Sequence, residues 1–239
     1  MSQFKPFQSK RLAYRAVEPN AADYDFIKYL QTVSQSRANT SLTLLKPRPQ
    51  NDPVDGYLNY LVKECLLAVI ILRNDNDTAT DTFSWIPIGV ISLKGDSPEC
   101  SHHRGGVLSV EIAPPYQNQG HGSEAIEWML DWGFQKAGLH RISLQAFSYN
   151  EGAGRLYERL GFRMEGRQRE AVWFDGAWHD MLFFGMLEGE WREEVAEWGG
   201  SSVVTQMPRI GLTAHKALQK PLPAGQAGSS VASSVFGAD

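Results

Sequence analysis

The sequence predicts a mixed α/β (α+β) fold in which a mixed sheet carries helices on both faces. Short apolar strands alternate with segments of helical spacing along most of the chain. Turn signals separate them, above all the pair Asp175-Gly176, which is typical of a β-hairpin. The chain has 239 residues, of which 42% are hydrophobic and 21% charged, and this composition excludes a chain that is disordered throughout.

The first part of the chain is predicted to hold two strands and two helices. Residues 11–17 form a short apolar strand, and Pro19-Asn20 mark the start of a helix that reaches about residue 33. A second short helix begins near Pro53, because proline suits the first helical turn, and runs to about residue 62. The unbroken apolar run from Cys65 to Leu72 predicts a strand that is buried on both faces.

The central part is predicted to form two strands and a long helix. The polar segment RNDNDTATD, from Arg73 to Asp81, is expected to be a loop, and strands follow at 85–93 and 106–113. Residues 120–137 are expected to be helical, because apolar side chains recur there at the three-and-four spacing of a buried stripe.

The last part is predicted to form three strands and a short helix. Residues 139–147 alternate as a strand does, and residues 152–160 form a helix. Strands at 162–174 and 178–187 then flank the hairpin turn. The order of elements is β-αα-βββ-α-β-α-ββ.

The chain divides by composition into one domain and a tail. Residues 8–190 carry the predicted elements and have a comfortable size for a single domain. Residues 199–239 are rich in Gly, Ser, Ala and Pro and are expected to be a flexible tail, because such a segment buries too little surface to offset its ordering entropy. A docking segment within residues 203–218 is the alternative.

Composition and charge exclude several classes of protein. The longest apolar run, Cys65 to Leu72, is far shorter than the roughly 20 residues of a membrane-spanning helix, and the start of the chain lacks the apolar stretch of a signal peptide. Two cysteines cannot form a disulfide framework, which favours a reducing compartment. The net charge of −4 and the lack of a basic block argue against a nucleic-acid partner. We therefore expect a cytoplasmic protein, with access to a nucleus left open, and no membrane partner.

The segment from Ile112 to Gly122, IAPPYQNQGHG, is predicted to bind a diphosphate. Two prolines end the preceding strand, and a helix opens at Gly120. The first amides of a helix lack an internal partner and carry partial positive charge, while glycines let a ligand approach the backbone. A strand–turn–helix junction whose glycines only serve packing is the alternative.

A dinucleotide fold competes for the same segment, because Gly120 to Ala125 fits the pattern G-x-G-x-x-A. Six residues, however, stand between the strand and the first glycine, whereas the dinucleotide turn places that glycine directly after the strand. The next strand also ends in QAFS, without the acid that would hold a ribose. Nicotinamide chemistry is therefore disfavoured.

A second motif follows the next strand. Asn150 is a natural N-cap, and Tyr157 lies two helical turns further on and faces the same side. Gly161 is typical of a helix end.

Together these segments resemble the two signatures of the GNAT N-acetyltransferase superfamily. Residues Ile112 to Gly122 resemble its acetyl-CoA signature, V-x-P-x-x-[QR]-G-x-G-x-[GA], and Asn150 to Phe162 resemble N-x-x-[AS]-x-x-L-Y-x-x-x-G-F. The closing hairpin is similar to that of the spermidine and ribosomal-protein acetyltransferase branch, and the resemblance covers about residues 10–188. It implies a mostly antiparallel central sheet of about seven strands.

The resemblance also implies roles for individual residues. The Ile112 backbone would meet the pantetheine arm, Asn150 would bind pantetheine or the substrate side, and Tyr157 would lie beside the thioester sulfur. The amides from Gln117 to Ser123 would hold the pyrophosphate. The expected cofactor-binding residues are therefore Ile112, Gln117, Asn118, Gln119, Gly120, His121, Gly122, Ser123 and Asn150. Asn118 stands where the family usually has glycine, but asparagine tolerates left-handed backbone angles.

Two side chains are candidates for proton transfer. Glu111 could take the proton of a protonated amine, whose reference pKa is about 10.4, or it could be a partly exposed strand acid. Tyr157 could donate a hydrogen bond to the departing thiolate, or it could only pack its helix on the sheet. A backbone N–H near Ile112 would stabilise the oxyanion.

Other conspicuous residues are given plain interpretations. No metal site is expected, because His102-His103 are adjacent residues of a loop and adjacent ligands rarely converge. Trp128 and Trp132 are expected to pack, and the side chains of His121 and Arg155 are expected to be solvated.

The sequence therefore predicts an acetyl-CoA-dependent N-acetyltransferase that works by direct attack of an amine in a ternary complex, without metal or covalent enzyme intermediate. The acceptor would be a small-molecule amine or a protein amino group, bound by the N-terminal helices and the segment from Asp75 to Phe83. A non-catalytic acyl-CoA-binding regulatory domain is the alternative, and a homodimer is left open.

Overall fold

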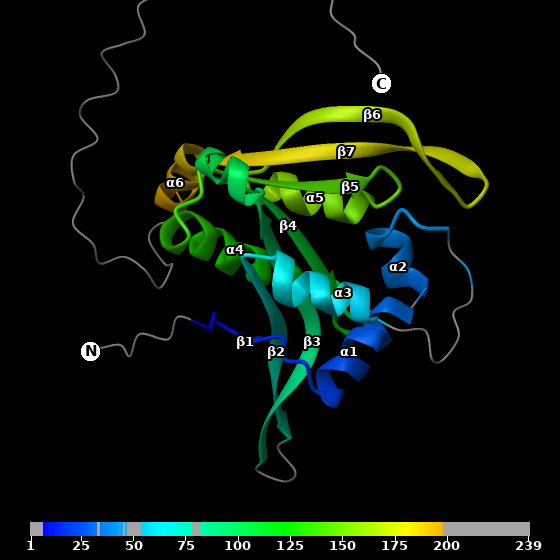
Figure 1. Cartoon of the computed structure of the whole chain (residues 1–239), viewed down its shortest axis with the longest axis vertical. Helices are drawn as coiled ribbons and strands as arrows, with labels where there is room; N and C mark the ends of the chain where they lie inside the picture. Colours follow the sequence, from blue (N-terminus) through cyan, green and yellow to red (C-terminus); the bar gives the residue numbers. More distant parts are fainter. Residues whose placement is uncertain (1–6, 33, 45, 47–53, 78–81, 198–239) are drawn as a thin grey trace, which may run out of the picture. The chain divides into compact units, whose positions relative to one another are not determined.

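The computed structural model describes residues 7–32, 34–44, 46, 54–77 and 82–197 (Figure 1). The predicted tail, with its alternative docking segment, lies outside the described residues. No helix in the described ranges is long and apolar enough to cross a membrane.

The described residues form a seven-stranded sheet with the strand order β1-β2-β3-β4-β5-β7-β6. The strands are β1 Leu12–Ala16, β2 Leu67–Asp77, β3 Thr82–Gly95, β4 Gly105–Ile112, β5 Arg141–Phe147, β6 Arg163–Phe174 and β7 Ala177–Leu187. Neighbouring strands are antiparallel except β4 and β5, which are parallel. The predicted mixed, mostly antiparallel sheet is confirmed.

The sheet is flanked by helices that precede and follow its strands in the chain. They are α1 Ala21–Thr32, α2 Ser34–Thr40, α3 Asp55–Asn59, α4 His121–Asp131, α5 Glu151–Arg159 and α6 Glu188–Glu197. Single π-helical turns extend α3 over Tyr60–Glu64 and α4 over Trp132–Lys136. Short 3-10 helices span Pro98–His103 and Pro114–Tyr116.

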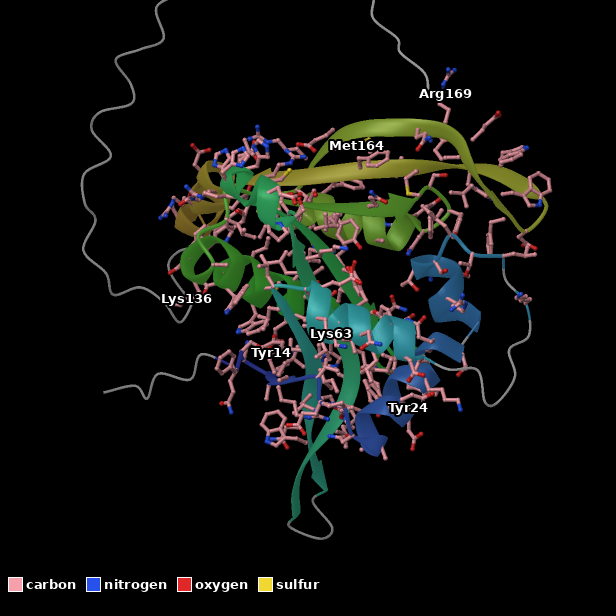
Figure 2. The ribbon with its side chains drawn as sticks, viewed as in Figure 1. Tyr14, Tyr24, Lys63, Lys136, Met164 and Arg169 are labelled. Atoms are coloured by element: carbon pink, nitrogen blue, oxygen red, sulfur yellow. The ribbon has the colours of Figure 1, made fainter. Side chains whose placement is uncertain are left out.

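Helices cover both faces of the sheet, as the alternation along β2 shows. Val69 and Ile71 pack with Ile126 and Met129 of α4, whereas Ile70 packs with Ile27 of α1 in a separate core. Tyr14 of β1, which is labelled in Figure 2, lies on this sheet. Its ring stacks on Trp128 of α4, with centroids 3.8 Å apart. The predictions of a doubly buried strand and of a packing role for Trp128 are confirmed.

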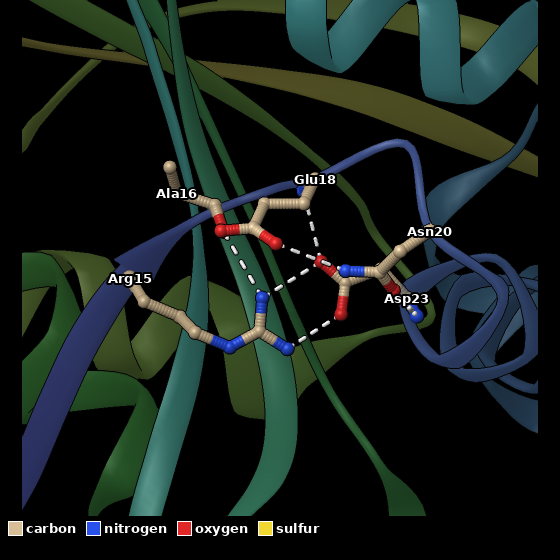
Figure 3. Close-up of polar contacts among 5 residues, drawn as sticks. All are labelled: Arg15, Ala16, Glu18, Asn20 and Asp23. Atoms are coloured by element: carbon tan, nitrogen blue, oxygen red, sulfur yellow. Dashed lines mark hydrogen bonds and ion pairs between the residues drawn. The ribbon is translucent and has the colours of Figure 1, made fainter.

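An ion pair between the partly exposed Arg15 and the buried Asp23 fixes the first helix to the first strand (Figure 3). Asn20 caps α1, since its Oδ1 accepts a hydrogen bond from the Asp23 amide at 2.9 Å. The Asp23 carboxylate accepts two hydrogen bonds from Arg15, at 2.7 and 2.5 Å, and one from the Glu18 amide at 2.9 Å. This network confirms that the helix starts at Pro19-Asn20.

The structure corrects several element predictions. The strand expected from Cys65 begins only at Leu67, and it continues through Arg73 to Asp77, so that the loop predicted for this polar segment was wrong there. The reason is cross-strand pairing, for example of Asn74 with Trp85. Such pairing gives the backbone N–H and C=O groups hydrogen-bond partners even where the side chains are polar. Helices α2 and α6 were not predicted.

Candidate active site

The central feature of the sheet is a gap between its two parallel strands. The β4–β5 ladder joins only Gly105 to Val107 with Arg141 to Ser143. Beyond it, β4 stays paired with β3 as far as Ile112, and β5 stays paired with β7 as far as Phe147. The two strands therefore diverge, and their facing edges border an opening through the sheet.

Two cavities meet at this gap. The first, here the loop cavity, has a volume of about 500 Å³ and is lined by the segment after β4 and by α5. The second, here the helix cavity, has a volume of about 430 Å³ and is lined by α1, α2, α3 and the facing edges of β4 and β5. Both cavities are lined by Asn39, Thr40, Val110, Glu111 and Tyr157.

The loop after β4 has the backbone that the sequence predicts. Asn118 adopts a φ of 58° and Gly120 a φ of 79°, so asparagine does take the left-handed conformation where the related signature has glycine. Helix α4 begins directly after Gly120, and the amides of its first turn have no partner inside the helix. The loop therefore presents helix-terminal donors beside the loop cavity.

The structure places most of the predicted binding residues around this cavity. It is lined by Ile112, Gln117, Asn118, Gly120, Gly122, Ser123 and Asn150. Two predicted residues, Gln119 and His121, are not among its lining residues. The Gln119 side chain instead donates to the Pro115 carbonyl at 2.9 Å.

His121 is buried, so the expectation of a solvated side chain was wrong. Its ring is only 4% exposed, and neither nitrogen has a hydrogen-bond partner among the described residues. Burial lowers the pKa of His121, and the positive charges of Arg11 and Arg73 lower it further, partly opposed by Glu124. The imidazole is therefore neutral near pH 7.

The loop is braced from outside by Arg11, which the sequence did not single out. The Arg11 Nη1 donates to the Gln119 carbonyl at 3.0 Å, and its Nε donates to Glu124 at 2.7 Å. Ser9 also donates to Glu124, at 2.7 Å. These bonds hold the Gln119 carbonyl on the outer side of the loop.

Helix α5 supplies the opposite wall. The Asn150 Oδ1 accepts from the Ala153 amide at 3.2 Å, which confirms the predicted N-cap. Two cations of this helix, Arg155 and Arg159, line the cavity. The Arg155 side chain is exposed, as expected, while Arg159 donates to the Ser123 hydroxyl at 3.2 Å. Both guanidinium groups suit an anionic ligand.

Tyr157 and Glu111 stand where the two cavities meet. The Tyr157 ring packs against Phe162 and Phe184, and burial raises the pKa of its hydroxyl to about 12. Glu111 is 6% exposed, so the alternative of a partly exposed strand acid was wrong. Its Oε2 accepts a hydrogen bond from Gln31 of α1 at 3.3 Å.

The remaining candidates lie elsewhere. His102 and His103 lie on an exposed 3-10 helix, and no group of at least three His, Cys, Asp or Glu side chains within the described ranges could hold a metal ion. The N-terminal helices line the helix cavity, and that they bind the acceptor stays a prediction. The side chains from Asp75 to Phe83, expected to join them, fall outside the described part of the chain.

Comparison with proteins of known family gives consistent matches. Residues 38–162, more than half of the chain, match the family described as "Acetyltransferase (GNAT) family". The uncharacterized N-acetyltransferase YnaD of Bacillus subtilis is 35% identical over 78 residues, which cover 33% of this chain and 46% of YnaD. A spermidine N(1)-acetyltransferase of Vibrio cholerae is 32% identical over 89 residues, covering 37% and 51% of the two chains. The matched segments thus span about half the length of these relatives.

A solved structure extends the likeness over most of the fold. Spermidine N-acetyltransferase from Vibrio cholerae, in complex with CoA and spermine, superposes with a TM-score of 0.61 at 23% identity. The match covers 77% of this chain and 99% of that one, so the fold is shared over the described strands and helices. With the family match over more than half its length, this chain belongs to the GNAT acetyltransferase family.

Proposed function

We propose that this protein transfers an acetyl group from acetyl-CoA to a primary amine by direct attack within a ternary complex. The observation that carries the proposal is the meeting of two cavities at the β4–β5 gap, with Glu111 and Tyr157 at their junction. One cavity suits a coenzyme and the other an acceptor. Family membership and the acetyltransferase relatives support the same chemistry.

The loop cavity fits the diphosphate and pantetheine of a coenzyme A thioester. The first amides of α4 and the guanidinium groups of Arg155 and Arg159 would bind the phosphates. Gly122 lines the cavity without a side chain, so the ligand could approach its backbone closely. The Ile112 carbonyl already accepts from Gln117 at 2.7 Å, so its amide is the group left to face the acyl carbonyl.

Glu111 would act as the base and Tyr157 as the hydrogen-bond donor to the leaving group. The bound thioester supplies an activated acetyl group. Glu111 would take a proton from the incoming ammonium, directly or through water, so that the nitrogen lone pair can attack the acetyl carbon. As the carbon–sulfur bond breaks, Tyr157 would hydrogen-bond to the sulfur, which leaves with the bonding electron pair.

Transfer through an enzyme thioester is disfavoured by the position of Cys65. This residue lines neither cavity, and burial raises the pKa of its thiol despite hydrogen bonds with Tyr60 and Ser92. A poorly ionised thiol away from the gap is a weak nucleophile. Direct attack by the amine is the route that the geometry supports.

The test is release of free thiol from acetyl-CoA with a panel of amines, together with calorimetry of acetyl-CoA binding. We expect both binding and amine-dependent release. Binding without release for any amine would instead favour the non-catalytic acyl-CoA-binding domain. Absence of binding would remove the basis for both.

A further inference from the structure

We propose that Tyr149 is a positioning residue for the amine acceptor. Its hydroxyl holds the last turn of α2 beside the β4–β5 gap, where that turn forms part of the wall of both cavities. The proposal rests on the acetyl transfer proposed above and adds to it a residue from outside the site. Tyr149 is not among the described residues that line either cavity, so it acts through α2.

The last turn of α2 borders the place where the two bound substrates have to meet. Asn39 and Thr40 line the loop cavity and the helix cavity alike, as Glu111 and Tyr157 also do. A displacement of this turn would therefore change how the amine is placed against the thioester. The rate of a reaction between two bound molecules depends steeply on that placement.

The end of α2 takes a hydrogen-bond donor from a distant part of the chain. The last carbonyls of a helix have no N–H partner within the helix. Helix α2 ends at Thr40, so the N–H that would continue the pattern from the Ala38 carbonyl belongs to Leu42, beyond the helix end. The Tyr149 hydroxyl donates to this carbonyl across 111 positions of sequence. A residue that follows β5 thus caps α2.

The ring that carries this hydroxyl is held by the strands beyond the gap, β5, β7 and β6. It stacks on Phe147 of β5 with centroids 5.2 Å apart, and on Phe174 of β6 with centroids 4.5 Å apart. His179 of β7 packs edge-on against it at 4.9 Å. Aromatic pairs at such distances favour particular ring orientations. The sheet therefore sets the position of the hydroxyl, and the hydroxyl sets the position of α2.

The turn that contains Tyr149 is also fixed to its neighbours. The Ser148 amide donates to the Asp180 carbonyl at 2.9 Å, and the Ser148 Oγ accepts from the Asp180 amide at 2.9 Å. The Asn150 amide donates to the Phe147 carbonyl at 2.9 Å. Burial raises the pKa of Tyr149 to about 12, so its hydroxyl keeps its proton and stays a donor near neutral pH.

Tyr149→Phe removes the hydroxyl and keeps the stacked ring, so the variant should fold. We expect KM for the best amine of the panel to rise about fivefold, as the loss of one neutral hydrogen bond would allow, and the acetyl-CoA Kd to stay within about twofold. A general loss of stability would not separate these two constants. Tyr29→Phe makes the same chemical change at an exposed position of α1 and should alter neither.

A second measurement does not depend on turnover. Arg37 precedes Ala38 in α2 and is only 8% exposed, so trypsin should cleave after Arg37 only when this part of the chain opens. Cleavage at this bond, followed by mass spectrometry of the full-length protein, should be about fivefold faster in Tyr149→Phe, because opening then breaks one hydrogen bond fewer. Tyr29→Phe should be cleaved at the wild-type rate.

The outcomes separate this inference from the proposed function. An amine KM that Tyr149→Phe leaves unchanged, or one that rises no more than the acetyl-CoA Kd, overturns the inference while acetyl transfer stands. An unchanged rate of cleavage after Arg37 overturns it as well. If acetyl-CoA binds but no amine in the panel releases thiol, the proposed function itself fails, and the role of Tyr149 toward the amine fails with it.

Discussion

Replacing Tyr157 with phenylalanine removes one hydroxyl from the junction of the two cavities and keeps the ring. The edge-to-face contacts with Phe162 and Phe184, at centroid distances of 6.1 and 5.7 Å, need only that ring. Folding should therefore survive the substitution. Any change in turnover then reports on the hydroxyl.

The size of the change follows from the environment of the hydroxyl. Burial raises the pKa of Tyr157 to about 12, whereas a thiol has a reference value of about 8.5, so full proton transfer to the thiolate is uphill by roughly 3.5 units, or about 5 kcal/mol. That cost is larger than the roughly 2 kcal/mol expected from unperturbed pKa values. The hydroxyl should therefore stabilise the leaving sulfur as a hydrogen-bond donor.

A hydrogen bond to a charged group is worth about 1.5–3 kcal/mol, which corresponds to a loss of roughly 10- to 150-fold in kcat for Tyr157→Phe. The measurements are thiol release at saturating amine, calorimetry of acetyl-CoA binding, and thermal unfolding. We expect kcat to fall by this factor while the acetyl-CoA Kd stays within about threefold. Tyr29→Phe, an exposed tyrosine on α1, should match the parent protein.

Two results would refute this reasoning. An unchanged kcat would reduce Tyr157 to a packing residue, the alternative noted from the sequence. The second result is a kcat that decreases between pH 8 and 10 in the wild-type protein but not in Tyr157→Phe. It would mean that the Tyr157 hydroxyl ionises far below the pKa of about 12 that burial imposes.

Three further predictions concern the scaffold. Arg11→Ala removes the brace on the Gln119 carbonyl and Glu124 and should raise KM for acetyl-CoA about fivefold, with the amine KM unchanged; equal increases in both would contradict a local effect on the loop. Asp23→Asn should lower the free energy of unfolding in urea by about 2 kcal/mol at pH 7, discounted because Arg15 is partly exposed. Burial raises the Asp23 pKa, but hydrogen bonds from Arg15 and the Glu18 amide outweigh it and leave the pKa below its usual value. The stabilisation by ionised Asp23 should therefore be present above about pH 4 and be lost at lower pH. If Asp23→Asn lost as much stability as the wild-type protein over this pH range, the loss would not come from Asp23. Phe184→Ala should lower the free energy of unfolding in the same assay by about 3–5 kcal/mol, since Phe184 is 1% exposed. A decrease below about 1 kcal/mol would mean that the surrounding side chains fill the space left by the ring.

Local features of the site could be predicted because their causes are local. Prolines end β4, left-handed conformations at Asn118 and Gly120 turn the chain, and the Asn150 cap opens α5 within three residues. Each of these effects acts between near neighbours in the sequence. The motif spacing then follows from the lengths of one helix and one strand.

Contacts between distant segments could not be predicted in this way. Arg11 meets Glu124 across 113 positions, and Gln31 meets Glu111 across 80. Nothing in the spacing of a single sequence marks such partners. Helix α6 was missed for a similar reason, because Trp191 stabilises it by packing on Phe134, with ring centroids 5.4 Å apart.

The location of the candidate site follows from the single parallel pair of the sheet. A parallel pair needs a crossover connection, and here that connection is α4, whose first turn must therefore lie close to the end of β4. Because β5 continues to pair with β7 and β4 with β3, each strand follows a different partner after Val107 and the two separate. The gap thus opens beside the N-terminus of α4, whose first amides have no partner inside the helix. Loop donors, the Glu111 carboxylate and the Tyr157 hydroxyl can meet there because the ladder stops after three residue pairs, and a longer β4–β5 ladder would close the site without altering any of these side chains.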